Sequence, residues 1–359
     1  MSLALALGQR GLGNTWPNPS VGAVIVREEQ GTPLVVGRGW TQPGGRPHAE
    51  VEALRRAGDA ARGATLYVTL EPCSHHGRTP PCADAIIAAG IARVVSALED
   101  PNPEVAGSGH ARLRAAGIAV EVGLGAEEAR LAHAGHIRRM RDQRPHVTLK
   151  LAISADGKAG TAGRRPATIT GEAARARVHR MRAMNDAILV GIGTALADDP
   201  QLTCRLPGME KFSPVRVVLD THLRLPAAGA LAVSAQQTPV WVVSGADVSA
   251  ETVRALRQKG VEVLHAAAQA GRLDLAAVLR LLAERGITRL MIEGGPTVAA
   301  SFVAADLVDA AVLFRSAKGL GADGIDALEG LPLEALTGPL KSLGREPVGE
   351  DSVEFFARP

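Results

Sequence analysis

The sequence predicts two α/β domains in one chain. Its 359 residues exceed what a single hydrophobic core usually supports, so the length favours two domains. In both halves, short β-type runs alternate with Ala-rich helical stretches, a pattern typical of sheets covered by helices. An Arg-rich helical stretch ends at Pro145, which indicates a domain boundary with a linker near residues 140–146.

The first half has β-type runs at VGAVIV, ATLYVTL and ARVVSAL, helical stretches at AEVEALRRAG and ADAIIAAG, and a further short unit at GIAVEVGL. Residues 127–144 predict one amphipathic helix. The apolar start MSLALAL lacks a basic leader and a cleavage site, so we expect a truncated first helix rather than a signal peptide.

The second half predicts another α/β domain, with no evident repeat of the first. Its β-type runs are HVTLKLAIS, AILVG, VRVVLD, PVWVVSG, VEVLHA, RLMIEGG and AAVLF. Helical patterns cover residues 171–184, 250–259 and 274–285. This alternation favours a sheet with helices on its faces.

The composition favours a soluble globular protein, and a phosphorylated small molecule as its ligand would agree with the mildly basic charge. Hydrophobic residues make up 46% and charged residues 21%, and no apolar run approaches the roughly 18 residues of a membrane span. The net charge of +3 is not gathered in basic blocks, so we expect neither nucleic acid nor membrane as a partner. Three cysteines, an odd number, argue against a disulfide framework and for the reducing cytoplasm.

Four side chains of the first half suit a catalytic zinc ion. His48 and Glu50 lie at the start of a predicted helix, Cys73 follows the run ATLYVTL, and Cys82 opens the next helix, whose positive end favours a thiolate. One histidine and two cysteines supply three ligands and leave the fourth position for water, as in catalytic zinc sites. Glu50 is then free to carry protons, so the pattern predicts hydrolytic deamination.

The spacing of the cysteines leaves alternatives open. Eight residues separate Cys73 from Cys82, whereas the general deaminase signature has two. His75 and His76 lie between them and could instead be ligands of a structural zinc in a binding module without activity. A nucleic-acid deaminase is a further alternative, although aromatic residues for base stacking make up only 3% of the chain.

The run RLMIEGGPT in the second half predicts a strand that passes through Gly294 and Gly295 into a helix with Pro296 in its first turn. Such a helix end would present free backbone amides to a cofactor phosphate. A plain tight turn explains the two glycines equally well.

A second glycine pair follows the run AILVG. Gly191 and Gly193 are spaced as in a dinucleotide fingerprint, but Leu196 stands where the third glycine belongs. Asp220, at the end of VRVVLD, keeps a Rossmann fold as the alternative for this domain.

Several segments closely resemble the bifunctional deaminase/reductase family of bacterial riboflavin biosynthesis. They are PNPSVGAVIV (17–26), PHAEVEALRRAG (47–58), TLEPCSHHGRTPPC (69–82), EDPNPEVAGSG (99–109), LKLAISADGK, LADDPQLTCR and IEGGPT. The spacing of eight residues between the cysteines is that family's form. The resemblance covers essentially the whole chain.

The resemblance implies a fold and an activity for each domain. Residues 1–143 would form a three-layer domain similar to cytidine deaminase, which uses Zn²⁺ to hydrolyse the 2-amino group of a diaminopyrimidinone ribonucleotide. Residues 146–359 would form a domain similar to dihydrofolate reductase, which uses NADPH to reduce the ribosyl unit to ribityl. A phosphorylated pyrimidine ribonucleotide would be the substrate, and the chain would form a homo-oligomer through the reductase domain.

The resemblance also implies site residues by position. His48, Cys73 and Cys82 would bind zinc, with Glu50 as the proton donor, and the residues around the pyrimidine nucleotide would be Asn18, Arg78 and Asn102. NADPH would contact Ala152, Thr194, Asp198, Thr221, Gly295, Pro296 and Thr297. The substrate of the reduction would contact Arg182, Leu202, Arg205 and Glu293. The reduction also needs a proton, and from the chemistry alone either Lys150 or Glu293 could assist its transfer.

Two positions depart from the family pattern. Thr41 stands where many relatives have a histidine, which questions a phosphate contact there. Where relatives often show Ser-x-Trp-Ile-Thr, this chain reads Pro166-Ala167-Thr168-Ile169-Thr170. The second departure motivates an alternative function, a deaminase whose reductase half is inactive or repurposed.

Overall fold

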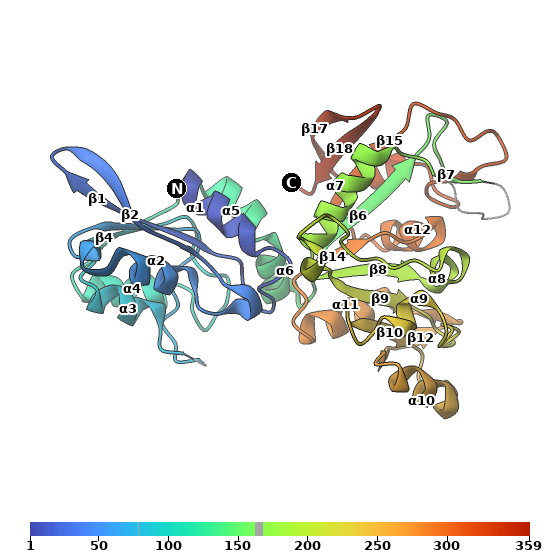
Figure 1. Cartoon of the computed structure of the whole chain (residues 1–359), viewed down its shortest axis with the longest axis horizontal. Helices are drawn as coiled ribbons and strands as arrows, with labels where there is room; N and C mark the ends of the chain where they lie inside the picture. The colour runs from blue at the N-terminus through green and yellow to red at the C-terminus, as the bar shows by residue number, and fades with distance from the viewer. Residues whose placement is uncertain (78, 162–167) are drawn as a thin grey trace. The chain divides into compact units, whose positions relative to one another are not determined.

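The computed structural model describes residues 1–77, 79–161 and 168–359. They fall into two compact units, Met1–Arg144 and Pro145–Pro359, which run from blue to teal and from green to red in Figure 1. Within the described residues, no helix has the length and apolar character needed to cross a membrane.

A mixed sheet forms the centre of the first unit. Its strand order is β2-β1-β3-β4-β5; β1 is antiparallel to β2 and β3, and the other pairs are parallel. The strands are β1 (Gly22–Glu29), β2 (Thr32–Trp40), β3 (Thr65–Val68), β4 (Arg93–Ser96) and β5 (Ala119–Val122). The helices are α1 (Ser2–Gly8), α2 (Ala49–Ala57), α3 (Cys82–Ala88), α4 (Ser108–Ala115), α5 (Ala126–Ala132) and α6 (Ala134–Asp142).

Helices cover both faces of this sheet. Because successive strand side chains point to opposite faces, Ala23 and Ile25 of β1 enter the main core, whereas Val24 packs with Ala4 and Leu7 of α1. Figure 1 shows α2, α3 and α4 on one side of the sheet and α1 and α5 on the other. The predicted three-layer α/β arrangement is therefore confirmed.

Strand β2 carries no alternating apolar pattern and is missing from the predicted elements. Its contact with α2 runs through glycines, since a Cβ at Gly37 would lie 2.3 Å from the carbonyl oxygen of Ala53, and one at Gly39 would lie 2.3 Å from that of Ala49. Backbone rather than apolar side chains packs on α2, so the period-two signal is absent. This close contact fixes the start of α2.

The single helix predicted over residues 127–144 is wrong, because α5 and α6 are separate helices. The chain leaves helical geometry at His133, which has φ −97° and ψ 12°. The His133 ring is buried, and its Nε2 lies 3.0 Å from Oγ1 of Thr69. The bend lets α6 start in a new direction, which periodicity within the segment does not reveal.

The second unit is built on a larger sheet with the order β11-β10-β9-β8-β14-β6-β15-β18-β17. The pairs from β11 to β15 are parallel, and β18 is antiparallel to both β15 and β17. The strands are β6 (His146–Ile153), β8 (Ala187–Gly191), β9 (Val215–Leu219), β10 (Val240–Ser244), β11 (Glu262–His265), β14 (Arg289–Ile292), β15 (Ala310–Arg315), β17 (Lys341–Val348) and β18 (Asp351–Ala357).

Helices connect these strands and cover the sheet. They are α7 (Glu172–Ala183), α8 (Ile192–Asp198), α9 (Ala230–Val233), α10 (Ala250–Gln258), α11 (Leu275–Glu284), α12 (Pro296–Ala304) and α13 (Glu334–Thr337). Two further sheets have two short strands each. One pairs β7 (Lys158–Gly160) with β16 (Ile325–Asp326), and the other pairs β12 (Ala268–Gln269) with β13 (Arg272–Leu273). The helices predicted at 171–184, 250–259 and 274–285 are confirmed as α7, α10 and α11.

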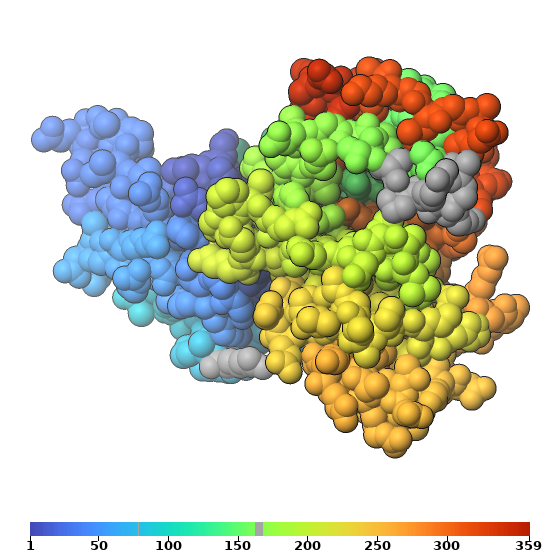
Figure 2. All heavy atoms as spheres, turned by 45° about the vertical axis from the view of Figure 1, so that its right-hand side comes forward, coloured from blue at the N-terminus to red at the C-terminus, as the bar shows by residue number. Residues whose placement is uncertain are grey.

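The strand order decides against the Rossmann alternative. The first strand of this unit, β6, lies between β14 and β15, and the C-terminal hairpin extends the sheet antiparallel to its parallel part. A Rossmann sheet has its first strand next to its second and fourth. Figure 2 shows the C-terminal residues in red at one end of this unit and the residues around α10 in orange at the other.

A matched pair of leucines tests the core of the first unit. Leu66 of β3 is fully buried, whereas Leu34 of β2 is 48% exposed. We expect Leu66→Ala to lower the free energy of unfolding by about 2–5 kcal/mol, because it leaves a cavity. Leu34→Ala should change it by less than about 0.5 kcal/mol. Hydrogen exchange of β1–β4 peptides across a urea series measures both, and equal effects would contradict this core assignment.

Candidate active sites

The starts of α2 and α3 bring three potential metal ligands together. His48 is the N-cap residue of α2, Cys82 is the first residue of α3, and Cys73 lies on the loop after β3. Their ligand atoms all lie within 4.8 Å of one another. Nδ1 of His48 is 3.3 Å from Sγ of Cys82 and 3.7 Å from Sγ of Cys73. Tetrahedral zinc ligands at ordinary bond lengths stand about 3.6 Å apart, so these residues fit a zinc ion.

Neighbouring groups orient the three ligands. Nε2 of His48 lies 3.4 Å from Nδ2 of Asn18, which also donates a hydrogen bond of 2.9 Å to the carbonyl oxygen of Gly45. Nδ1 of His48 faces the two sulfurs, so Nε2, the nitrogen that carries the proton in a histidine bound to metal through Nδ1, points toward the Asn18 amide. The backbone N–H of Cys82 donates to Sγ of Cys73 over 3.3 Å.

Hydrogen bonding favours the thiolate form of Cys73. A hydrogen bond from the Cys82 thiol lowers the pKa of Cys73 to about 4, with smaller contributions from His48 and the Cys82 backbone, while burial opposes the shift. The pKa of Cys82 is raised, chiefly because its thiol donates that bond. The hydrogen bond with Cys73 also raises the pKa of His48. One negative charge is thus already favoured among the ligands, as a cation requires.

Glu50 lies in the first turn of α2 beside the ligands. It is 3% exposed, and burial raises the pKa of its carboxyl. It lines a cavity of about 170 Å³ together with His48 and Cys73. A buried carboxyl next to a metal-bound water suits proton transfer.

Two of the three residues predicted to contact the nucleotide line the same cavity. Asn18 and Asn102 line it, whereas Arg78 lies outside the described residues. Thr41 also lines the cavity, but its Oγ1 accepts a hydrogen bond of 3.0 Å from the backbone N–H of Val21. His76 is exposed and, like His75, is not part of the ligand cluster, so the alternative that uses these two residues finds no support.

Several cavity residues were not predicted. They include Arg46, Asp100 and, from α6, His136 and Arg139. Nε2 of His136 lies 2.9 Å from Oδ1 of Asp100, and both residues are buried. These residues come from segments distant in sequence, and none belongs to a ligand or nucleophile pattern. Only a histidine in an otherwise Arg-rich helix could have drawn attention to α6.

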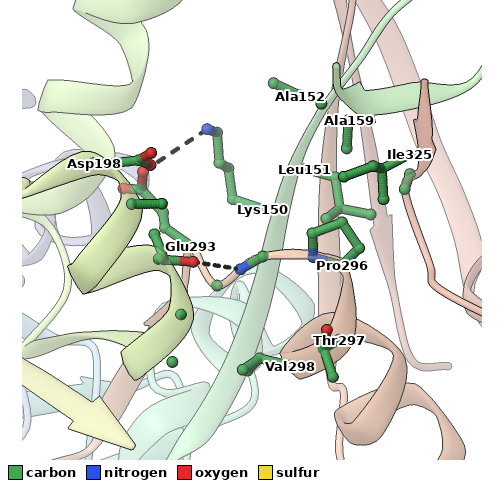
Figure 3. Close-up of a pocket in the computed structure, with 18 of the residues that line it drawn as sticks. Lys150, Leu151, Ala152, Ala159, Asp198, Glu293, Pro296, Thr297, Val298 and Ile325 are labelled. Atoms are coloured by element: carbon green, nitrogen blue, oxygen red, sulfur yellow. Dashed lines mark hydrogen bonds and ion pairs between the residues drawn. The ribbon is translucent and has the colours of Figure 1, made fainter. Parts of the chain in front are cut away.

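The second unit contains a larger cavity of about 590 Å³ at the ends of β6, β8 and β14. Figure 3 shows Lys150, Ala152 and Glu293 in its lining, together with Pro296 and Thr297 at the start of α12. Thr194, Asp198 and Gly295 line it as well. The structure therefore brings these predicted residues into one cavity.

Two glycines allow the turns around this cavity to meet. A Cβ on Gly191 would lie 2.6 Å from Cγ2 of Val298, and one on Gly294 would lie 2.8 Å from its Cβ. The close approach lets the backbone N–H of Gly295 donate to Oγ1 of Thr194 over 3.1 Å. The expectation of a free amide is therefore wrong for Gly295, because the Thr194 hydroxyl already accepts its proton.

A buried ion-pair network lies at the cavity wall. Oε1 and Oε2 of Glu293 accept hydrogen bonds of 2.9 Å and 3.0 Å from Nε and Nη2 of Arg182. Nζ of Lys150 lies 3.8 Å from Oε2 of Glu293, and Figure 3 shows Lys150 and Glu293 in the cavity lining. Burial by itself would raise the pKa of Glu293, but Arg182 and Lys150 outweigh it and hold the pKa below its ordinary value. A third donor of Arg182, Nη1, binds the carbonyl oxygen of Thr203 over 3.1 Å.

Four predicted residues do not line this cavity. Arg182 contacts it only through Glu293, Leu202 is buried in the hydrophobic core, and Arg205 is exposed. Thr221 lies two residues after Leu219, which does line the cavity. Asp220, the residue that kept the Rossmann alternative open, is fully buried, and its Oδ2 accepts a 2.8 Å hydrogen bond from the Leu225 N–H. Asp220 therefore stabilises the turn after β9 and is not available to bind the ribose of a dinucleotide.

Comparison with known proteins agrees with the two units. Residues 1–98 match the cytidine and deoxycytidylate deaminase zinc-binding region, and residues 145–352 match the RibD C-terminal domain. The riboflavin biosynthesis protein RibD of Aquifex aeolicus is 42% identical over 360 residues, which cover 100% of this chain and 97% of the relative. That of Escherichia coli is 42% identical over 344 residues, which cover 92% and 91%. The chain belongs to the RibD family.

Solved structures of the family share the whole fold. RibD of Acinetobacter baumannii superposes with a TM-score of 0.87 at 37% identity and covers 100% of this chain and 97% of its own. The deaminase/reductase of Thermotoga maritima has a TM-score of 0.85 at 35% identity, with the same coverage. Like other RibD proteins, the chain is a bifunctional riboflavin biosynthesis enzyme with a zinc deaminase domain and an NADPH-dependent reductase domain.

Glu50 can be tested against a glutamate of the same helix. Glu50→Gln should keep zinc but lower the rate of ammonia release by about 10²- to 10⁴-fold, because the amide cannot carry the proton. Glu52→Gln is the control, since Glu52 pairs with Arg55 and lies outside the cavity lining. Metal content by atomic emission and ammonia release are the measurements. A Glu50→Gln protein that deaminates normally would remove Glu50 from the reaction.

Arg182 can be tested in the same way in the second unit. Arg182→Lys keeps the charge but loses the two-pronged contact with Glu293, so we expect the reductase kcat/KM to fall about tenfold or more. The control is Arg180→Lys on the exposed side of α7. NADPH oxidation and ammonia release are measured for both variants. Equal reductase rates in the two variants would show that the fork geometry is unimportant.

Proposed function

We propose that this chain acts twice on one pyrimidine ribonucleotide. The first reaction would hydrolyse the 2-amino group of 2,5-diamino-6-(5-phosphoribosylamino)pyrimidin-4(3H)-one and release ammonia. The second would reduce the ribosyl side chain of 5-amino-6-(5-phosphoribosylamino)uracil to ribityl. The observation that carries the first step is the ligand spacing of His48, Cys73 and Cys82, with buried Glu50 in the same cavity. The Thermotoga relative bears the name of these two activities.

We assign the deamination to residues 1–143. His48, Cys73 and Cys82 would hold zinc, which supplies an activated water at neutral pH. Glu50 would take the proton of that water and pass it to the leaving ammonia. Arg46 and Arg139 line the cavity and would bind a substrate phosphate through their guanidinium groups.

In the same domain, Asn18 and Asn102 would orient the pyrimidine ring. Both line the cavity, and the Asn18 amide is already held by its hydrogen bond to the carbonyl oxygen of Gly45. A held amide loses little entropy when it binds a ring edge, so it can distinguish the substrate from analogues without the matching polar group. Arg78 remains a proposed contact from outside the described residues.

We assign the reduction to residues 146–359. NADPH supplies the hydride, and the residues proposed to hold it are Ala152, Thr194, Asp198, Thr221, Gly295, Pro296 and Thr297. The cavity of about 590 Å³ is large enough for much of a drug-sized ligand. Lys150, whose ammonium faces the cavity beside Glu293, is the nearer candidate to give a proton, because the two arginine bonds already occupy the Glu293 carboxylate.

The substrate of the reduction would meet Arg182, Leu202, Arg205 and Glu293. Arg182 is paired with Glu293 at the cavity wall, and Arg182, Leu202 and Arg205 themselves lie outside the described lining. Thr168, within the segment that departs from the family, is exposed, while Pro166 and Ala167 lie outside the described residues. A homo-oligomer through the reductase domain and a cytoplasmic location stay predictions.

A coupled assay tests both steps. Wild-type protein given the diaminopyrimidinone ribonucleotide should release one ammonia per substrate and then oxidise NADPH, and faster than NADH. Removal of zinc with a chelator should stop ammonia release, while reduction of the separately supplied uracil nucleotide continues. Ammonia release without any later NADPH oxidation would contradict the second activity and restore the deaminase-only alternative.

A further inference from the structure

Glu71 is a buried carboxylate with no assigned role in the deaminase domain. It lies on the loop between β3 and Cys73, and its side chain is fully buried. Both of its oxygens accept backbone hydrogen bonds. Oε2 accepts from the N–H groups of Asp100 and Gly107 over 3.1 Å and 3.0 Å. Oε1 accepts from those of Gly109 and His110 over 2.9 Å and 3.1 Å.

These four amides belong to one segment, residues 100–110. Asp100 starts the loop that carries Asn102, and the other three donors lie at the N-terminus of α4, whose N-cap residue is Gly107. The first amides of a helix lack partners within the helix, and a negative charge is favourable there. Glu71 therefore accepts hydrogen bonds from the start of α4 and from the loop before it at the same time. Glu71 itself lies two residues before Cys73, the proposed zinc ligand.

The junction is tightly packed as well as hydrogen-bonded. A Cβ on Gly109 would lie only 2.0 Å from the carbonyl oxygen of Pro72 and 3.2 Å from Cγ of Glu71. The start of α4 thus rests directly on the backbone of the zinc loop. A side chain at Gly109 would force the two segments apart.

The contacts continue from Glu71 to the proposed substrate residue. Oδ1 of Asp100 accepts a hydrogen bond of 2.9 Å from the backbone N–H of Asn102 and lies 2.9 Å from Nε2 of His136. Asn102 is therefore two hydrogen bonds away from Glu71. Asp100, Asn102 and His136 all line the cavity that contains the zinc ligands.

A second metal ion at Glu71 is the competing explanation. Glu71, Glu99 and His110 offer ligand atoms within 4.8 Å of one another. A carboxylate has about four acceptor positions, and four N–H groups already fill those of Glu71. Glu99 is exposed. The arrangement serves the backbone and leaves no lone pair for a cation.

We propose that Glu71 is a positioning residue that sets the distance between the zinc site and the segment that holds the pyrimidine. One carboxylate ties both loops of the cavity together, so the place of Asn102 relative to the zinc ligands depends on it. Small errors in such a distance reduce the rate and the affinity strongly, because the reacting atoms must be held in line. This inference rests on the proposed deamination and on the substrate contact of Asn102.

The variant Glu71→Gln tests this inference, with Glu99→Gln as the matched control. Glutamine has one oxygen, so its NH₂ group would face two of the four N–H donors and the segment 100–110 would shift. We expect the KM for the diaminopyrimidinone ribonucleotide to rise about tenfold or more, with bound zinc unchanged. Reduction of the separately supplied uracil nucleotide should keep its wild-type rate. Amides of residues 100–110 should exchange faster with deuterium, whereas those of α2 should not.

Every result of the Glu71→Gln experiment either supports or refutes the positioning role of Glu71. If Glu71→Gln keeps the wild-type KM, or loses zinc together with activity, positioning of segment 100–110 is refuted. If Glu71→Gln and Glu99→Gln behave alike, the effect is one of charge only, and the inference fails. Where Glu71→Gln gives no soluble protein, Gly109→Ala probes the same junction from α4, and a normal KM there refutes the inference. Absence of ammonia release by the wild type would instead refute the proposed function.

Discussion

The arrangement of the first domain depends on one constraint, that Nδ1 of His48 must lie between two sulfurs. Each ligand is fixed by a different backbone contact. The position of His48 depends on the contact of the β2 glycines with α2. Cys82 is held as the first residue of α3, and Cys73 follows the loop residue Glu71, which is hydrogen-bonded to the start of α4. The metal then needs little rearrangement of the protein, and its binding energy is available to stabilise the folded state.

In the second domain, contacts between backbone segments again hold the residues of the cavity in place. Two strand-to-helix turns meet because Gly191 and Gly294 have no side chains where Val298 packs. That contact places Thr194 next to Gly295 and leaves Glu293 at the end of β14, facing Arg182 from α7. A carboxylate paired in this way keeps its charge in a buried place, where an unpaired one would be strongly disfavoured.

Glu71 and Glu293 show two ways to hold a buried carboxylate. Glu71 is surrounded by neutral backbone donors and joins two loops, whereas Glu293 faces two cationic side chains at a cavity wall. The first arrangement fixes the backbone. The second leaves a charge network beside the cavity that Lys150 and Glu293 line.

The sequence by itself determined the α/β class, most strands of both sheets and the chemistry of the zinc site. Those features follow from local patterns and from ligand types that few other sites share, such as His48 and Glu50 two residues apart at one helix start. The eight residues between Cys73 and Cys82 needed the family resemblance. Only the tertiary structure revealed β2, the break at His133, the four amides on Glu71 and the displacement of Leu202 and Arg205 from the cavity lining. These depend on backbone contacts between segments distant in sequence, which leave no periodic pattern of side chains to detect.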